Sequence, residues 1–251
     1  MAASTDLRID PITSADDFPE AHQVVTNAFA KQAGDEIWTH FNPGWDTPAG
    51  QAAAAARMAA RFSKTTRDAA GDPNTVFLKA TLPDADRGAG ARRIVGVAIW
   101  VQLSMVEGRG DRPVEDLRAA ADLEALYPGD ARAQRYCVEV ERGLHRRRAE
   151  VVRAKAGEAQ PAVMVLDLCA VEIGFQRRGI AQKLVRWGLE EAARRGGLEA
   201  LTEASAMGRG AYVKLSFRQE GPEIDYGVSE EFKDWKKPSN IFMRTGLEGL
   251  E

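Results

Sequence analysis

The chain has 251 residues, enough for one large domain or for a domain with a long insertion. Its composition, 44% hydrophobic and 28% charged, is typical of a soluble globular protein, and a net charge of −3 gives no support for nucleic-acid binding. No stretch reaches membrane-spanning length, and the start MAASTDLRID lacks the apolar segment of a secretion signal. Of the two cysteines, Cys169 falls in an apolar run typical of a core strand, so we expect no structural disulfide and a reducing, cytoplasmic location.

The N-terminal part of the chain predicts strands and helices from the spacing of its apolar residues. We expect, in chain order, a strand over 7–12, a helix from Ser14–Asp17 to about Ala30, a loop over 34–50, a helix over about 49–69, and strands over 75–82 and 92–103. The last two strands are separated by a polar, glycine-rich loop and therefore predict a hairpin. Gly96 inside the second of them indicates a bulge or a close approach of another element.

Residues 104–160 predict a mainly helical segment ahead of the next strand. One helical pattern covers Val114–Ala125, and a long charged helix follows over about 130–156. Glutamates interrupt its basic run at His145–Arg148, so we interpret the run as a solvated helix face with ion pairs rather than as a nucleic-acid site. We read 104–160 as a helical insertion that forms either a wall of a binding site or a dimer surface.

Residues 163–196 predict a buried strand, a basic glycine turn and a helix. Val163–Val171 is almost entirely apolar, as in a strand covered on both faces, and its one charge is Asp167. The turn reads Gln176-Arg177-Arg178-Gly179-Ile180-Ala181, and a helix with apolar residues at helical spacing starts at Ile180. The first amides of a helix lack intrahelical partners and the helix dipole is positive there, so this basic turn predicts a pyrophosphate site.

The C-terminal part predicts a strand over 198–204, a loop, a short helix over 210–215 and a closing hairpin that includes a strand over 241–245. The short helix reads GAYVKL and is followed by Ser216-Phe217.

The turn resembles motif A of the GNAT acyl-CoA N-acyltransferases, whose signature is [Arg/Gln]-x-x-Gly-x-[Gly/Ala]. The segment Ala211–Phe217 is similar to the family pattern Leu-Tyr-x-Lys-Leu-Gly-Phe, except that Ala211 replaces the leucine and Ser216 the glycine. The resemblance is good over 163–217 and loose over the N-terminal half.

The resemblance implies the GNAT fold, an α/β (α+β) domain over 1–251, with a mixed, mostly antiparallel sheet that splays where the strand over 163–171 and the strand over 198–204 diverge. Acetyl-CoA would lie in that splay, with its pyrophosphate on the turn and its pantetheine along the strand over 168–171. The cofactor-binding residues implied are Leu168, Cys169, Ala170, Val171, Gln176, Arg177, Arg178, Gly179, Ile180 and Ala181, and Ser205 would hydrogen-bond CoA or the acceptor.

The implied reaction is direct attack of an amine on the thioester, with no metal. Tyr212 is our candidate for the acid that protonates the leaving thiolate, because the family tyrosine of this helix faces the CoA sulfur. Asp167 is a candidate base: strand alternation puts it on the same face as Cys169, although a buried ion pair with an arginine is an equal alternative. Some histone-type members carry their glutamate at the position of Val165, so only parity supports Asp167. Glu203 is a second candidate base, acting through water.

We expect the acceptor to be a primary amine of a small molecule, with Trp38, Phe41 and Trp45 walling its pocket. An equal reading is that these rings only fasten their loop to the core. A peptide or protein amine remains open as acceptor, as does a non-catalytic CoA-binding role on the same fold. The sequence leaves monomer and homodimer open.

Overall fold

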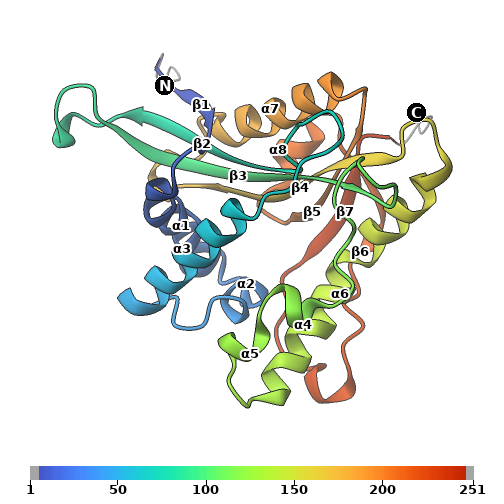
Figure 1. Ribbon diagram of the computed structural model, residues 1–251. Coiled ribbons are helices and arrows are strands. Elements are labelled where there is room, and N and C mark those ends of the chain that lie inside the picture. The colour runs from blue at the N-terminus through green and yellow to red at the C-terminus, as the bar shows by residue number, and fades with distance from the viewer. Residues whose placement is uncertain (1–5, 247–251) are drawn as a thin grey trace.

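A mixed seven-stranded sheet crosses the molecule in the order β1-β2-β3-β4-β5-β7-β6 (Figure 1). The structure is a computed structural model that describes residues 6–246. Every strand pair is antiparallel except β4 with β5, which is parallel. The strands are β1 Arg8–Pro11, β2 Thr75–Pro83, β3 Arg92–Ser104, β4 Ala162–Val171, β5 Glu199–Ser205, β6 Arg218–Glu223 and β7 Asn240–Arg244.

Helices cover both faces of this sheet (Figure 1). On one face α7 and α8 pack on a core that includes Leu184 and Tyr212, and on the other α1 and α3 pack on a core that includes Phe18. The helices are α1 Phe18–Thr26, α2 Glu36–His40, α3 Pro48–Ser63, α4 Leu117–Ala120, α5 Leu123–Leu126, α6 Ala131–Ala154, α7 Ile180–Arg194 and α8 Arg209–Val213. Within residues 6–246 no helix combines the length and apolarity needed to cross a bilayer.

The predicted hairpin is present, with β3 antiparallel to β2 over the whole length of β2. Its register shifts after Ala80, the partner of Gly96. A Cβ on Gly96 would also lie 3.0 Å from Ile180 and 3.2 Å from Leu184. Both readings of this glycine therefore hold, since it adjoins a bulge and lets α7 approach the sheet.

Several helix boundaries differ from the prediction. The first predicted helix divides into a 3₁₀ turn, α1 and a π-helical segment over Asn27–Ala33, and the second ends at Ser63. The predicted loop over 34–50 contains α2. The Asp35 side chain accepts a hydrogen bond from the backbone amide of Trp38 at 2.9 Å and so caps the start of this helix.

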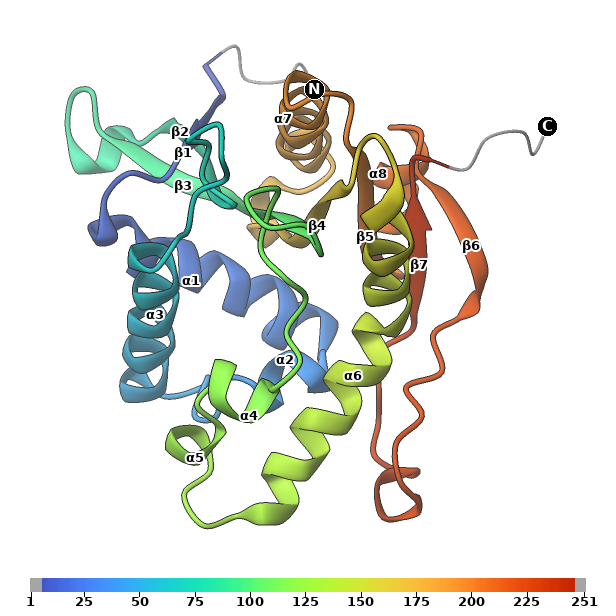
Figure 2. The same cartoon turned by 45° about the vertical axis from the view of Figure 1, so that its right-hand side comes forward.

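The segment between β3 and β4 contains α4, α5 and α6. The single helix predicted over Val114–Ala125 is wrong, because the segment forms two short helices. Asp116 caps α4, and Asp122, whose left-handed backbone has a φ of +47°, ends the helical path and caps α5. The long helix is confirmed as α6, which runs alongside β5 and β7 (Figure 2).

The predicted splay is confirmed between β4 and β5. Their pairing is limited to three positions and ends at Val165 and Leu201, although β4 continues to Val171 and β5 to Ser205. The Thr202 hydroxyl donates to the carbonyl of Leu166 at 3.0 Å just beyond the last pair. We call this divergence the β4–β5 splay.

Candidate functional site

The turn after β4 has the backbone expected of an anion-binding loop. Arg177 and Gly179 both have left-handed backbones, with φ of +61° and +79°. Gly179 precedes α7 without a side-chain cap, so the first amides of this fifteen-residue helix are not satisfied by a side chain. Nothing lies within 4 Å of a Cβ built on Gly179, so the glycine is needed for its backbone conformation. Arg177, Arg178 and Gly179 are exposed.

Internal contacts hold this loop in shape. The Gln176 amide donates to the carbonyl of Val171 at 3.0 Å and to Gln32 at 2.7 Å. The Arg178 guanidinium donates to the Gly174 carbonyl at 2.9 Å and lies 5.1 Å from the ring of Phe175. The loop is therefore preorganised, and an incoming anion would not have to order it.

Cys169 and Tyr212 meet in the core beneath α7. Tyr212 is only 7% exposed and belongs to the core cluster on that face of the sheet, and the partly buried Cys169 packs against the same cluster. Burial, followed by the nearby Cys169, raises the pKa of Tyr212 well above its ordinary value, so the phenol is protonated. Burial also raises the pKa of the Cys169 thiol to about 12, which suits a small packing residue better than a nucleophile.

The prediction that Asp167 and Cys169 share a face is wrong, because β4 has a bulge at Asp167. Leu166 pairs with Trp100 and Leu168 with Ile99, which leaves Asp167 without a partner on β3. Leu168 consequently packs in the same core as α1, whereas Cys169 packs with α7. An extra residue reverses the alternation of a strand.

Asp167 instead contacts two arginines. Arg148 of α6 donates to one carboxylate oxygen at 2.8 Å and Arg61 of α3 to the other at 2.9 Å. Burial alone would raise the pKa of Asp167, but the two guanidiniums hold it far below its usual range. This geometry favours the ion-pair reading of Asp167 over a free base.

Glu203 forms the other half of the same arrangement. Both of its oxygens accept from the Arg148 guanidinium, one of them at 3.1 Å. Arg148 is 7% exposed. Because it contacts Asp167 of β4 and Glu203 of β5, it bridges the two strands on either side of the β4–β5 splay. The interpretation of 145–148 as a solvated face is therefore wrong for Arg148, which turns inward because buried carboxylates require a partner.

Sequence reasoning missed His145 and Glu141, which face the same cluster from α6. The Nδ1 of His145 lies 3.0 Å from the Glu141 carboxylate. Glu141, His145 and Arg148 are spaced i, i+4 and i+7, so they lie on one side of α6. That spacing was the available signal, but it also fits an exposed row of ion pairs.

The three predicted acceptor rings do not form one group. Trp38 packs near His22 and Phe29 in the core beside α1, and Phe41 packs in a separate cluster around Tyr136. The carbonyl of Trp45 accepts from Gln51 at 2.9 Å. For Trp38 and Phe41 this packing supports the reading that the rings fasten their segment to the core.

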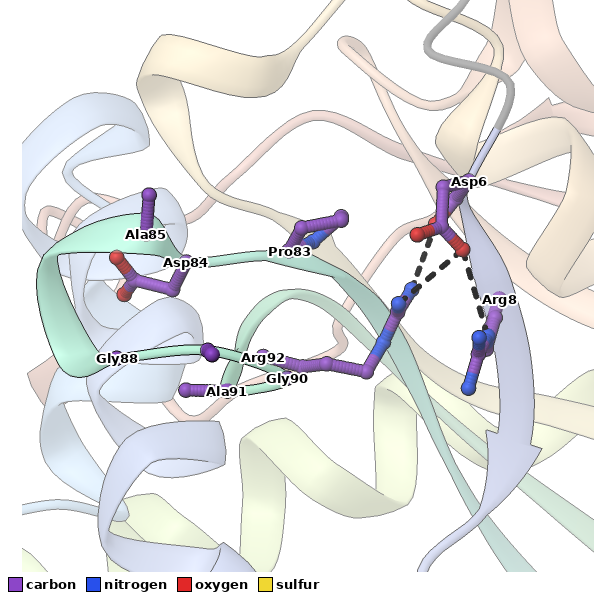
Figure 3. A pocket seen from close by; sticks show the side chains of 10 residues that line it. Asp6, Arg8, Pro83, Asp84, Ala85, Gly88, Gly90, Ala91 and Arg92 are labelled. Atoms are coloured by element: carbon purple, nitrogen blue, oxygen red, sulfur yellow. Dashed lines mark hydrogen bonds and ion pairs between the residues drawn. The ribbon is translucent and has the colours of Figure 1, made fainter.

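Two surface hollows lie elsewhere. One, of about 420 Å³, is lined by β1 and the β2–β3 turn, where Asp6 pairs with Arg8 and Arg92 (Figure 3). The other, of about 470 Å³, lies between α1 and α3. Neither includes a predicted site residue. Within residues 6–246 no group of His, Cys, Asp and Glu is arranged to hold a metal ion.

Ser205 ends β5 opposite Asn240 of β7, and it lies on the same strand face as Glu203 by alternation. Its predicted contact with CoA or acceptor stays a prediction.

No protein-family model matches the sequence, and no curated protein matches it. Solved structures do match the fold. A histone acetyltransferase HPA2 and related acetyltransferase from Corynebacterium glutamicum aligns with a TM-score of 0.52 and 20% identity over 98% of this chain and 99% of that one. Arylalkylamine N-acetyltransferase 2 from Aedes aegypti aligns with a TM-score of 0.57 and 18% identity over 96% and 98%.

A putative arylalkylamine N-acetyltransferase 7 from the yellow fever mosquito aligns with a TM-score of 0.58 and 17% identity over 95% of this chain and 86% of that one. The expected fold is thereby confirmed: the chain has the α/β fold of the GNAT acetyltransferases.

Proposed function

We propose that this protein is an acetyl-CoA-dependent N-acetyltransferase that acylates a primary amine of a small molecule. The observation that carries the proposal is the β4–β5 splay, which has a preorganised basic loop at the end of β4 and a protonated tyrosine beneath it. Fold alone would not support an activity, because one fold hosts many functions.

The residues along the splay fit an acyl-CoA. The uncapped first turn of α7, with Arg177 and Arg178 beside it, matches the charge and shape of a pyrophosphate. Beyond Val165, β4 has lost its β5 partner, so backbone groups of 168–171 on that edge can pair with the amides of a pantetheine arm. The bound thioester supplies the acyl group.

Around that thioester the chain supplies two kinds of assistance. A backbone amide near Cys169–Val171 donates to the carbonyl oxygen as negative charge develops on it. Tyr212, which burial keeps protonated, donates its hydroxyl proton to the departing sulfur. In this proposal Asp167 and Glu203 act chiefly by fixing Arg148, since each is already paired with it.

The acceptor side favours a cationic amine. Three carboxylates, those of Glu141, Asp167 and Glu203, face two guanidiniums, those of Arg61 and Arg148. With His145 neutral, this cluster has one more negative than positive charge, which would attract an ammonium group. The neighbours named arylalkylamine N-acetyltransferases make an aromatic amine a reasonable first choice. Of the three predicted aromatic contacts only Trp45 is kept in this proposal, since Trp38 and Phe41 pack in two separate clusters.

The proposal is tested by thiol release from acetyl-CoA with 2-phenylethylamine, tryptamine, spermidine and a short peptide with a free N-terminus. We expect amine-dependent release by the wild type. Tyr212→Phe, which loses only the proton donor, should lower kcat by about 10- to 1000-fold while leaving CoA affinity within a few-fold.

The runner-up is a non-catalytic CoA-binding protein on the same fold. CoA binding without thiol release across the whole panel would contradict the enzyme proposal and favour this alternative. Equal kcat for wild type and Tyr212→Phe would remove Tyr212 from the chemistry while leaving the enzyme proposal in place.

A further inference from the structure

We propose that His145, oriented by Glu141, is the catalytic base that removes the proton from the acceptor ammonium. This inference rests on the proposed acetyl transfer. It assigns the base to a residue of α6 that precedes the strand–turn–helix unit, and it leaves Asp167 and Glu203 as positioning residues.

The contacts of the two predicted carboxylates leave the role of base open. Each oxygen of Asp167 accepts from a different arginine, and both oxygens of Glu203 accept from Arg148. A base needs a lone pair that can reach the substrate proton. A carboxylate whose two oxygens are held by guanidiniums does not offer one without breaking a buried ion pair.

The chain has three histidines, and their surroundings differ. His22 is 2% exposed, and its Nε2 is a buried atom without a partner. His40 uses Nδ1 in a contact with the carbonyl of Glu36 and packs between Tyr136 and Trp235. Among residues 6–246 neither ring is paired with a carboxylate.

His145 has the two features of a working base. Its Nδ1 lies 3.0 Å from the Glu141 carboxylate, a contact that favours a proton on Nδ1 and leaves Nε2 as the atom with the free lone pair. Within the described residues its Nε2 makes no hydrogen bond and is not one of the fully buried unpaired atoms, so it is not completely enclosed. The side chain is 29% exposed.

The position of His145 fits this role. It lies one helical turn from Arg148, which contacts β4 and β5 on either side of the splay. The charged groups that face it are Glu141 and Arg148 of its own helix, Glu203 of β5 and Asp167 of β4, and Arg61 of α3 reaches the same cluster through Asp167. An ammonium drawn to these carboxylates would therefore lie near Nε2.

The proton and electron balance is simple. Neutral His145 takes one proton from the ammonium at Nε2, and the amine lone pair then forms a bond to the thioester carbon. As the carbon–sulfur bond breaks, its electron pair goes to sulfur, which receives the Tyr212 proton. The new amide nitrogen gives its surplus proton to the tyrosinate, and His145 releases its own proton to water.

The charge environment gives this step a distinctive pH dependence. Burial and Arg148 lower the pKa of His145, but the carboxylates of Glu141 and Glu203 outweigh them, so that the pKa lies above its ordinary value. The neutral form grows as pH rises through that pKa, so kcat/KM rises with it. Removing the Glu141 charge lowers the pKa and moves the rise to lower pH.

The test measures kcat/KM for the best amine of the panel between pH 5.5 and 9.5, together with CoA affinity by calorimetry. His145→Gln should lose at least about 100-fold at pH 7 with unchanged CoA affinity, and its remaining rate should lack the histidine inflection. Glu141→Gln should keep the inflection but at lower pH. Arg142→Gln, an exposed change on the same helix, should match the wild type.

A His145→Gln enzyme within threefold of wild type, with the same pH profile, overturns the proposal. If that variant does not fold, an unshifted inflection in Glu141→Gln overturns it instead. Absence of thiol release by the wild type contradicts the acetyl-transfer proposal itself and His145 with it, whereas an active wild type with a normal His145→Gln variant contradicts His145 alone.

Discussion

At the scale of single residues, Arg148 is a buried charge that is paired with two carboxylates. It is a buried guanidinium that contacts a carboxylate on each side of the β4–β5 splay. Breaking such an arrangement leaves buried charges without a partner, which costs far more than losing an exposed pair.

Arg148→Ala should therefore lower the free energy of unfolding by about 3–5 kcal/mol, measured by urea denaturation. Arg147→Ala is the matched control on the same helix, since Arg147 pairs with Glu150 and Glu220 at the surface, and we expect a loss of about 0–1 kcal/mol. A triple variant, Arg148→Met with Asp167→Asn and Glu203→Gln, should recover part of the lost free energy of unfolding, because it leaves no buried carboxylate without its guanidinium. Equal losses for Arg147 and Arg148 would contradict a buried bridging role.

At the scale of elements, α7 is held to β3 by close approach at two glycines. Gly96 of β3 leaves room for Ile180 and Leu184, and a Cβ on Gly188 of α7 would overlap the buried ring of Trp100. A glycine inside a helix costs about 1 kcal/mol relative to alanine, so Gly188 is explained by packing rather than by helix propensity.

Gly188→Ala should destabilise the protein by about 2 kcal/mol or more, despite the gain in helix propensity, because the interior has no room for the methyl group. Gly210→Ala in α8 is the control: it has open space around its Cβ and should be neutral or stabilising by up to about 1 kcal/mol. Thermal and urea unfolding measure both changes. A stable Gly188→Ala protein would mean that α7 lies further from β3.

At the scale of the whole molecule, carboxylate–guanidinium pairs connect separate elements. Asp167 joins β4 to α6 through Arg148, and Glu199 joins β5 to β7 through Arg244. Glu191 pairs with Arg194 and Arg195 near the end of α7, and Arg194 reaches Asp72 ahead of β2. Hydrogen bonds from Arg194, opposed by burial and aided by Arg195, lower the pKa of Glu191 to about 2.

A carboxylate with a lowered folded-state pKa contributes stability that is present above its unfolded pKa and lost as pH falls through the folded value. For Glu191 that window runs from about pH 4.5 down to about 2. Glu191→Gln should thus be less stable than wild type by about 1 kcal/mol at pH 7, with the difference shrinking toward pH 2. A difference that does not vary with pH would show that Glu191 is not paired.

How far the sequence predicts this molecule depends on which interactions are local. The hairpin and the turn before α7 follow from strand periodicity and glycine placement, whereas the splayed pair was expected only from the resemblance of the turn to motif A. The bulge at Asp167 does not, because a single extra residue leaves the apolar pattern nearly unchanged while it turns the carboxylate to the opposite face.

The ion pairs between α6 and the strands of the splay could not be predicted from the sequence either. Glu141, His145 and Arg148 have a spacing that fits either a surface row or an inward face, and only the packing of α6 against β5 and β7 decides between them. Long-range pairs of this kind depend on the tertiary arrangement, which the local residue pattern of a single sequence does not reveal.

The most direct measurement for the central claim, that the loop of Arg177, Arg178 and Gly179 binds the pyrophosphate of CoA, is calorimetric titration of CoA. The account predicts saturable binding by the wild type, a loss of at least about tenfold in affinity for Arg177→Glu/Arg178→Glu, and no comparable loss for Arg142→Glu/Arg146→Glu, which changes the net charge equally on exposed positions of α6. No binding by the wild type, or equal affinity in the two charge-reversed variants, would contradict it.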